Sequence, residues 1–368
     1  MNFLLITGIF PPDIGGPAVY VPKLADTLAR KGHEVQVITL GQGNSEENFQ
    51  NFKVHKIDRS LFKPLRIFLT IWKIRKEISN SDLIFANGLF IETSIANLFS
   101  RKRSVYKIVG DPIWEKYRNR TKSKITLDEY QSTTKHWKSF FQRIIFNWAF
   151  SRASLITTPS ISLAKVVSSW KPFNGVEVIE NGTSCHSIYD EEKEFDLIVV
   201  SRLVSWKNID KIIQISARQS LRLLVCGDGP EYENLQSLSK KLEAKVTFVG
   251  QVQQSEVTRL LPLAHIYVQI SDYEGLSFAL LEAMMSGLGI VVSSVPGNSD
   301  VIGHLHEGLV VNQRNIGEVE DAIRLLLSDS KLRHKLSENA HKLVKRRYCE
   351  TTQIEKMILL IEGNFENY

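Results

Sequence analysis

The chain has 368 residues, of which 43% are hydrophobic and 23% are charged. This composition is that of a globular protein and excludes a disordered chain, and the length suffices for two or three domains. No apolar run reaches the roughly 18 residues that a membrane-spanning helix needs.

Cysteine usage and the start of the chain predict the compartment. Cys185, Cys226 and Cys349 are odd in number and far apart in the sequence, which fits neither a disulfide framework nor a zinc site. The apolar run after Met1 is too short for a signal peptide. We therefore expect a soluble, cytoplasmic protein in a reducing environment.

Charge is spread unevenly along the chain. Residues 1–190 carry 26 basic and 16 acidic side chains, whereas residues 191–368 carry 20 basic and 24 acidic ones. This asymmetry predicts an anionic partner for the first half.

The first half opens with a strand–loop–helix–strand pattern. Residues 3–7 and 35–39 are apolar strand-like runs, and a helical period lies between them. This predicts a right-handed βαβ unit, the beginning of a doubly wound sheet. The loop lacks G-x-G-x-x-G, which argues against a dinucleotide-binding dehydrogenase. Gly15 and Gly16 in that loop would let the backbone approach a ligand closely, unless they only form a turn.

Two stretches combine basic and aromatic residues. Residues 59–78 carry six basic side chains and one acidic one, and residues 101–152 carry 13 basic and four acidic ones. Such helices can lie on an anionic membrane surface, or their aromatic side chains can pack inward beneath solvated lysines. No nucleic-acid recognition motif accompanies them, so we expect no nucleic-acid partner.

Two further strands of the first half end in polar turns, at Asn87 and at Asp111. Because parallel strands present their carboxyl ends at one edge of a sheet, we expect both turns to lie there. Asp111 places a carboxylate at that edge, although it could equally form the turn before Pro112.

The second half repeats the alternation of strands and helices. The acidic run 190–194 predicts an exposed linker and a domain boundary near 190. After the strand at 195–200, Arg202 and Lys207 supply two cations that can clamp a diphosphate. Gln251 follows a strand at 245–250. We interpret the intervening segment 227–230 as a plain turn between ordinary elements.

The stretch 265–298 is the most informative. It predicts a buried strand, a helix capped by Ser277 and ended at Gly287, and another strand. Glu274 and Glu282 stand eight residues apart around the helix start, whose unpaired N–H groups suit an anion. Carboxylates accept hydrogen bonds from paired sugar hydroxyls. On spacing alone, a helix with a surface glutamate at each end is an equal alternative.

The run from Asp272 to Gly287, DYEGLSFALLEAMMSG, resembles the E-x7-E signature of retaining glycosyltransferases of family 4. The resemblance extends in order over nearly the whole chain. It implies an α/β protein with the GT-B fold, in which two Rossmann-like, doubly wound domains face a central cleft. It also implies an N-terminal acceptor-binding domain at 1–189 and a nucleotide-sugar domain at 190–350, with a last helix at 351–368 packing back on the first domain.

The resemblance also implies roles for individual residues. Glu274 would be catalytic and orient the sugar, while Glu282 would hold the ribose. The remaining donor-binding residues would contact the diphosphate or the base: Gly15, Gly16, Arg202, Lys207, Gln251, Gly275, Leu276 and Ser277. Ser201 and Asn208 stand where the family has glycine. Asn87 and Gly110-Asp111 stand where many relatives have a histidine, so whether catalytic Asp111 replaces that histidine stays open.

We therefore predict a retaining, metal-independent glycosyltransferase of the hexosyltransferase type. It would move a sugar from a nucleotide-sugar donor to a hydroxyl of a glycan or lipid-linked acceptor in cell-surface polysaccharide or glycolipid synthesis. We expect no cofactor and no metal, and a protein that is cytoplasmic or peripheral at the inner membrane face. The alternatives are a GT-B nucleotide-sugar epimerase, which would form an epimer without acceptor, and a non-catalytic sugar-nucleotide-binding protein.

Overall fold

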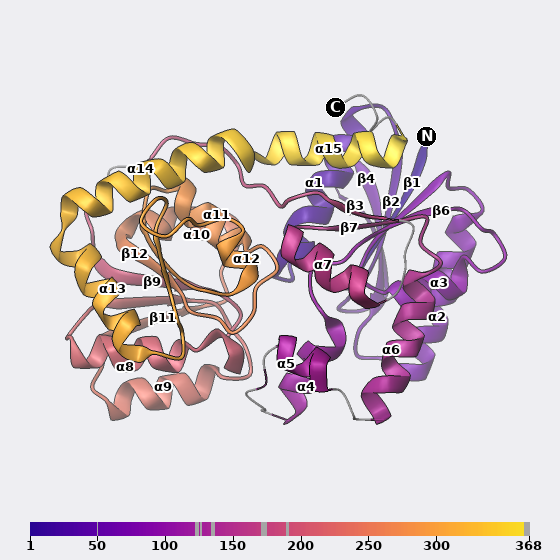
Figure 1. The fold of residues 1–368 in the computed structure, drawn as a ribbon. Coiled ribbons are helices and arrows are strands. Elements are labelled where there is room, and N and C mark those ends of the chain that lie inside the picture. The colour runs from indigo at the N-terminus through magenta and orange to yellow at the C-terminus, as the bar shows by residue number, and fades with distance from the viewer. Residues whose placement is uncertain are drawn as a thin grey trace. The chain divides into compact units, whose positions relative to one another are not determined.

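The computed structural model describes residues 1–49, 51–121, 125, 127–133, 137–170, 175–188 and 191–363. The chain forms two compact units (Figure 1). Unit 1 comprises residues 1–113, 133–180 and those from Gln353 on, and unit 2 comprises 114–132 and 181–352. Among the described residues, no helix is long and apolar enough to cross a membrane.

Unit 1 contains a sheet of order β3-β4-β2-β1-β5-β6-β7-β8, in which only β3 is antiparallel to its neighbour. Its strands are β1 (Asn2–Thr7), β2 (Glu34–Gly41), β3 (Ser45–Phe49), β4 (Phe52–Asp58), β5 (Leu83–Asn87), β6 (Arg103–Lys107), β7 (Leu155–Thr158) and β8 (Val176–Val178). Its helices are α1 (Gly16–Arg30), α2 (Lys63–Ile78), α3 (Phe90–Ala96), α6 (Trp137–Phe150), α7 (Ile161–Trp170) and most of α15 (Glu350–Glu362).

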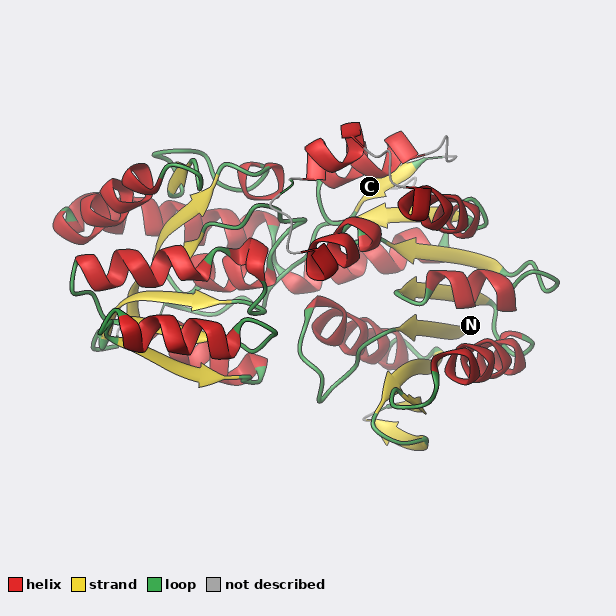
Figure 2. Cartoon of the chain, turned by 90° about the horizontal axis from the view of Figure 1, so that it is seen from below, coloured by secondary structure: helices red, strands yellow, loops and turns green. Residues whose placement is uncertain are grey.

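Alternation along the central strands of unit 1 separates two layers of side chains. Leu4 and Ile6 of β1 point to the side covered by α2, α3, α6 and α7, whose buried residues share one core with them. Helix α1 covers the other side, and α15 lies beside it, since Lys31 pairs with Glu355 at 2.7 Å. Figure 2 shows these strands between two layers of helices. The doubly wound architecture predicted from the sequence is confirmed.

Unit 2 has an all-parallel sheet of order β11-β10-β9-β12-β13-β14. Its strands are β9 (Phe195–Val200), β10 (Leu223–Cys226), β11 (Val246–Gly250), β12 (Ala264–Gln269), β13 (Gly289–Ser293) and β14 (Leu309–Val311). Its helices are η1 (Ser205–Lys207), α8 (Ile209–Arg218), α9 (Tyr232–Lys241), α10 (Gln254–Leu260), η2 (Leu261–Leu263), α11 (Phe278–Met285), α12 (Pro296–Ser299), α13 (Ile316–Ser328) and α14 (Ser330–Arg347). Two apolar clusters, one with α8, α9 and α13 and one with α10, α11 and α14, sandwich the sheet.

The boundary between the two units falls between residues 180 and 181, whereas the sequence placed it near 190. Residues 189 and 190 lie outside the described residues, but the segment from Asn181 already belongs to unit 2. It is tied there because Thr183 bridges Cys349 and Asn181 donates to the Leu276 carbonyl at 2.9 Å. Helices α4 (Pro112–Thr121) and α5 (Leu127–Thr133) lie largely in unit 2 as well.

Candidate active site

The candidate site of unit 2 lies at the carboxyl edge of its sheet, between β9 and β12. These neighbouring strands mark the point where the strand order reverses, because β10 follows β9 on one side and β13 follows β12 on the other. Open parallel sheets bind ligands at such a switch point. The loop after β9 carries Arg202 and Lys207, and the loop after β12 carries Glu274.

Lys207 and Glu274 meet across this switch point. The Lys207 ammonium donates to Glu274 Oε1 at 2.5 Å, and the side chains are only 16% and 9% exposed. A charge removed from water to this extent needs a partner or a ligand. The pair therefore holds one cation and one carboxylate ready at the sheet edge.

A hydrogen-bonded network supports the two loops. Asn208 donates to the Ile270 carbonyl at 2.8 Å and to Asp272 at 3.0 Å, and buried Arg118 of α4 donates to the other oxygen of Asp272 at 3.0 Å. Asn208 has φ of 53°, in the left-handed region. Asparagine tolerates that conformation better than most residues, which explains how it can stand where the resembling family has glycine.

Helix α11 starts beside Glu274 as the sequence predicted. Ser277 caps it by accepting from the Leu280 N–H at 3.3 Å, and Gly287 ends the turn with φ of 74°. Glu282 is buried within the helix and accepts from Gln254 of α10 at 2.5 Å. Its carboxylate is thus oriented by a neighbouring helix rather than lying on a solvated surface.

Glycines let neighbouring backbones approach the site closely. A Cβ on Gly297 would lie 2.1 Å from the Glu274 carbonyl oxygen, so α12 can pack on this loop only with glycine there. Likewise, a Cβ on Gly227 would lie 1.9 Å from the Ser201 carbonyl oxygen and one on Gly229 would lie 2.4 Å from that of Leu203. Segment 227–230 is the turn between β10 and α9 that the sequence predicted, and its glycines also fix the backbone on both sides of Arg202.

A buried polar chain lies beneath the loop after β12. Tyr267 donates to Gln269 at 2.8 Å, Gln269 donates to Asn298 at 2.8 Å, and Asn298 donates to the Ser293 carbonyl at 3.1 Å. Burial raises the pKa of Tyr267 well above its usual value, and the charges of Glu274 and Glu282 raise it further. Tyr267 therefore stays a neutral donor near the two carboxylates.

The other predicted donor-binding residues of unit 2 lie around the same edge. Arg202 is exposed at the end of β9, and Gln251 is exposed just after β11. Gly275 and Leu276 are buried, and the carbonyl of Leu276 is held by Asn181. The structure thus brings Lys207, Glu274 and the start of α11 together, with Arg202 after β9 and Gln251 after β11, two strands away at the edge of the sheet.

The predicted residues of unit 1 lie at the carboxyl edge of its own sheet. Gly15 has φ of 149° and precedes α1, which begins at Gly16. Asp111 is fully buried, accepts from the Ile113 N–H at 2.9 Å and pairs with Arg143 at 2.6 Å. Asp111 therefore forms the turn before Pro112 that the sequence allowed, and its catalytic role stays a prediction.

A buried polar row near that edge was not anticipated. Asn87, Lys107 and Thr157 occupy one register row of β5, β6 and β7. Lys107 donates to the Ile179 carbonyl at 2.9 Å, and its ammonium lies 4.4 Å from the ring centroid of Tyr20. Burial lowers the pKa of Lys107 to about 7. Lys107 stands between Tyr106 and Ile108 near the end of an apolar run, so the sequence indicated only a strand.

Sequence reasoning also missed the supporting residues Arg118, Asp272, Gln254 and Asn298. Each makes its contact with a residue far away in the sequence. The separation is 154 residues for Arg118–Asp272, 28 for Gln254–Glu282 and 29 for Gln269–Asn298. No local spacing signals such contacts. Among the described residues, no group of three or more His, Cys, Asp or Glu side chains is placed to hold a metal.

Comparison with known proteins identifies the class. Over 100% of both chains, the structure matches sucrose-phosphate synthase of Thermosynechococcus elongatus with a TM-score of 0.81 at 18% identity. It matches HepE of Anabaena, solved in complex with UDP-glucose, with a TM-score of 0.77 at 17% identity over 99% of this chain and 100% of that one. The protein therefore has the GT-B fold of glycosyltransferases, as the sequence predicted.

The family follows from the sequence comparison. Residues 14–187 match the model described as Glycosyltransferase Family 4, and residues 186–343 match that described as Glycosyl transferases group 1. An uncharacterised glycosyltransferase of Methanocaldococcus jannaschii is 27% identical over 99% of this chain and 100% of its own length. The chain belongs to glycosyltransferase family 4, and it is a glycosyltransferase.

Proposed function

We propose that the protein transfers a hexose from a nucleotide sugar to a hydroxyl of a glycan or lipid-linked acceptor, with retention at the anomeric carbon. The observation that carries this proposal is the Lys207–Glu274 pair of 2.5 Å beside the start of α11. It places a cation, helix N–H groups and a carboxylate at one sheet edge. These suit a diphosphate and the sugar attached to it.

In the proposed reaction, the bond between the anomeric carbon and the diphosphate oxygen breaks. A bond from the acceptor oxygen to the same carbon forms, and the proton of the acceptor hydroxyl passes to the departing diphosphate. Lys207, Arg202 and the N–H groups at Ser277 stabilise the charge that develops on the leaving diphosphate, a task suited to preorganised cations and dipoles. Glu274 accepts hydrogen bonds from the sugar, and Glu282 from the ribose.

Three finer features belong to the same proposal. The reaction needs no divalent metal, because protein cations neutralise the diphosphate. The products are cell-surface polysaccharides or glycolipids. The protein works in the cytoplasm, where nucleotide sugars are available, at the inner face of the membrane. UDP-sugars are the first donors to test, because the similar structure of HepE was solved with UDP-glucose.

The test is donor binding followed by an acceptor screen. Native mass spectrometry of the full chain with a panel of nucleotide sugars should detect one bound donor. Incubation of that donor with glycan and glycolipid acceptors should then release the nucleotide and give an anomerically retained product in the presence of a chelator. An epimerised donor without acceptor, or donor binding with no turnover on any acceptor, would overturn the proposal.

A further inference from the structure

Helix α2 of unit 1 carries an apolar strip on its outer side. Thr70, Ile74 and Ile78 face the core, as expected for an amphipathic helix. Large apolar residues on the opposite side of the helix are exposed to solvent. Among them, Phe62 is 75% exposed and Phe68 is 63% exposed. The strip consists of Phe62, Leu65, Phe68 and Trp72. The sequence left open whether these aromatic residues pack inward, and those of this strip do not.

Helix α6 presents a second exposed strip. Phe141, Ile144 and Ile145 are exposed, and Trp148 continues the helical spacing half-buried. Trp137 and Phe140, which the sequence grouped with them, lie outside the described side chains. Helix α3 packs against both α2 and α6, so all three helices share one side of unit 1 (Figure 1). Phe99, 76% exposed, follows α3 on the same side.

Cations border both strips. The Arg75 guanidinium lies 5.2 Å from the ring centroid of Phe99, and that of Arg152 lies 5.3 Å from the ring centroid of Trp148. The one acidic residue of α2, Glu77, is already paired with Lys73 at 3.0 Å. On the side of α6, Arg152 is such a cation, whereas Arg143 is paired with buried Asp111. Exposed apolar area with a basic border is complementary to an anionic, partly apolar surface.

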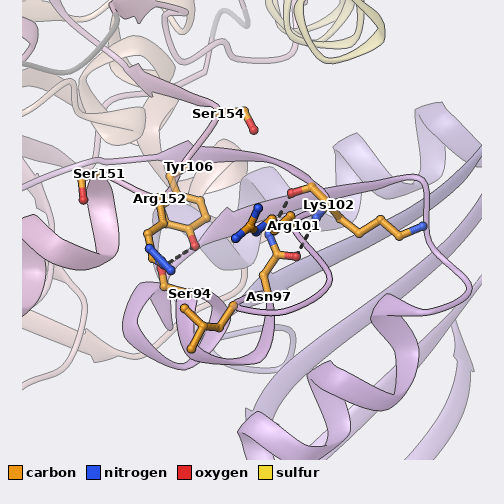
Figure 3. Close-up of a pocket in the computed structure, with 9 residues that line it drawn as sticks. Ser94, Asn97, Arg101, Lys102, Tyr106, Ser151, Arg152 and Ser154 are labelled. Carbon is orange, nitrogen blue, oxygen red and sulfur yellow. Dashed lines mark hydrogen bonds between the residues drawn. The ribbon is translucent and has the colours of Figure 1, made fainter.

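A polar pocket of about 300 Å³ lies beside the ends of α3 and α6. Arg101, two residues beyond Phe99, and Arg152 both line it, and Figure 3 shows them on opposite sides of Tyr106. The Lys102 side chain points away. The nine lining residues, none of them acidic, are Ser94, Asn97, Leu98, Arg101, Lys102, Tyr106, Ser151, Arg152 and Ser154. Guanidinium groups bind phosphate oxygens in a two-pronged geometry, so the pocket suits a phosphate group.

We propose that this side of unit 1, formed by α2, α6 and the pocket beside the ends of α3 and α6, docks on an anionic phospholipid bilayer. The apolar strips enter the boundary between headgroups and acyl chains, and Arg101 and Arg152 hold a lipid phosphate. A bilayer fits better than a protein partner, because the apolar residues are distributed over two helices among many cations. The chain would then meet acceptors carried by lipids, a last step that rests on the proposed function.

The test is cosedimentation of the full chain with vesicles, without donor or acceptor. The wild type should bind vesicles that contain phosphatidylglycerol and should bind pure phosphatidylcholine vesicles at least about tenfold more weakly, with a strong dependence on salt. Phe68→Ser/Trp72→Ser should weaken binding at least about tenfold, since both side chains would lose apolar burial. Arg101→Gln/Arg152→Gln should remove most of the preference for anionic lipid. Leu325→Ser, at an exposed leucine of α13 in unit 2, is the matched control and should bind as the wild type does.

The proposal fails if the wild type ignores anionic vesicles or if Phe68→Ser/Trp72→Ser binds them undiminished. It also fails if analytical ultracentrifugation shows a dimer that the same variant dissociates, because the strips would then be an interface between two copies. Nucleotide binding by the same variants separates this result from the proposed function. A variant that binds the nucleotide but not the vesicles leaves the glycosyltransferase reaction standing.

Discussion

Lys207 and Glu274 are joined across the switch point of the unit 2 sheet, 67 residues apart in the chain and 2.5 Å apart in space. Each comes from a loop after a different strand, and the two strands are neighbours. The lysine faces a carboxylate here, yet its ammonium has three donors and can also serve a diphosphate. The pair therefore makes separable predictions for the nucleotide and for the sugar.

Lys207→Met should weaken binding of the nucleotide diphosphate at least about tenfold, because a charge-assisted contact to phosphate is lost. Glu274→Gln should bind the nucleotide diphosphate at least as well as the wild type, yet lose about 100-fold or more in turnover. Isothermal titration calorimetry with UDP and a turnover assay with the donor and acceptor found by screening measure the two effects. Near-normal turnover of Glu274→Gln would contradict the assignment of this carboxylate to the sugar.

The control for this pair is Arg218→Ala. Arg218 pairs with Glu320 on the surface of the same unit, and its side chain is 50% exposed. An exposed ion pair contributes about 0–1 kcal/mol to stability. This variant should therefore match the wild type in nucleotide binding and in turnover, which would show that loss of a charge in unit 2 is not itself harmful.

Gly297→Ala tests the close packing of α12 on the site. The new Cβ would lie 2.1 Å from the Glu274 carbonyl oxygen and 2.6 Å from that of Gly275, so the loop that carries Glu274 must move. We expect a loss of about 1–3 kcal/mol in the free energy of unfolding, as for overpacked sites, together with reduced turnover. Urea unfolding and the turnover assay measure both.

The matched substitution is Gly317→Ala in the first turn of α13. The nearest atom to a Cβ there is Asn315 Oδ1 at 3.5 Å, an ordinary contact. We expect stabilisation by about 0.4–1 kcal/mol, because alanine restricts the unfolded chain. If both alanine variants behaved alike, the contact between α12 and the loop would not be the cause.

Local patterns predicted the elements that depend on neighbouring residues. Ser277 at the start of α11 and Gly287 at its end were predicted because a cap and a left-handed stop act within a few residues. Long-range contacts gave no such signal. Trp114 packs on Trp206 and Tyr273 within unit 2, whereas the sequence left open whether the aromatic residues of 101–152 face a membrane or pack inward.

Glycines and buried charges show the same limit. From the sequence, Gly227 and Gly229 predicted only a turn. The sequence does not reveal that the backbone of the loop after β9 packs directly against them. The sequence around Lys107 indicated only a strand, because nothing in the neighbouring residues shows that this lysine is buried. The residue pattern alone raised Glu274, Glu282 and Lys207 as candidates but left a helix with surface glutamates equally acceptable, so the choice rested on the resemblance to a family.

Lys107 predicts a pH dependence of stability. Burial lowers its pKa to about 7 in the folded protein, whereas an unfolded lysine has a pKa of about 10.4. Between these values the unfolded chain binds more protons, so this group makes stability rise with pH, by up to about 1.4 kcal/mol per pH unit. Below pH 7, Lys107 is protonated in both the folded and the unfolded state. Its contribution to the free energy of unfolding is then constant and at its least favourable value.

Lys107→Met should remove this contribution. Urea unfolding of the wild type and the variant at pH 7 and pH 9 measures the difference. From pH 7 to pH 9, the free energy of unfolding should change less favourably in the variant than in the wild type. The variant's advantage over the wild type should therefore be larger at pH 7 than at pH 9. Equal changes in both proteins over this range would show that Lys107 is charged in the folded state throughout.

Cys185 and Cys349 are neighbours, although the sequence separates them widely. The Cys349 thiol lies near enough to that of Cys185 to act on its pKa, and Thr183 forms a β-bridge with Cys349 next to them. Burial and the Cys349 thiol raise the pKa of Cys185 to about 12. Burial also acts to raise the pKa of Cys349, but hydrogen bonds from Cys185 and Thr351 outweigh it and lower that pKa. Cys349 is therefore the better nucleophile of the two.

We predict that diamide oxidises these two thiols to an intramolecular disulfide, while the diazene accepts the two hydrogens. Peptide mapping by mass spectrometry should find Cys185 linked to Cys349, and Cys349 should react with iodoacetamide faster than Cys185 does. Cys226 is the internal control, because it is buried and its pKa is raised to about 12, so it should stay reduced in the folded protein. Cys185→Ser should abolish the linkage. Disulfides only between molecules, or linkage through Cys226, would contradict the adjacency of the two thiols, because an intramolecular bond requires Cα atoms within about 7 Å.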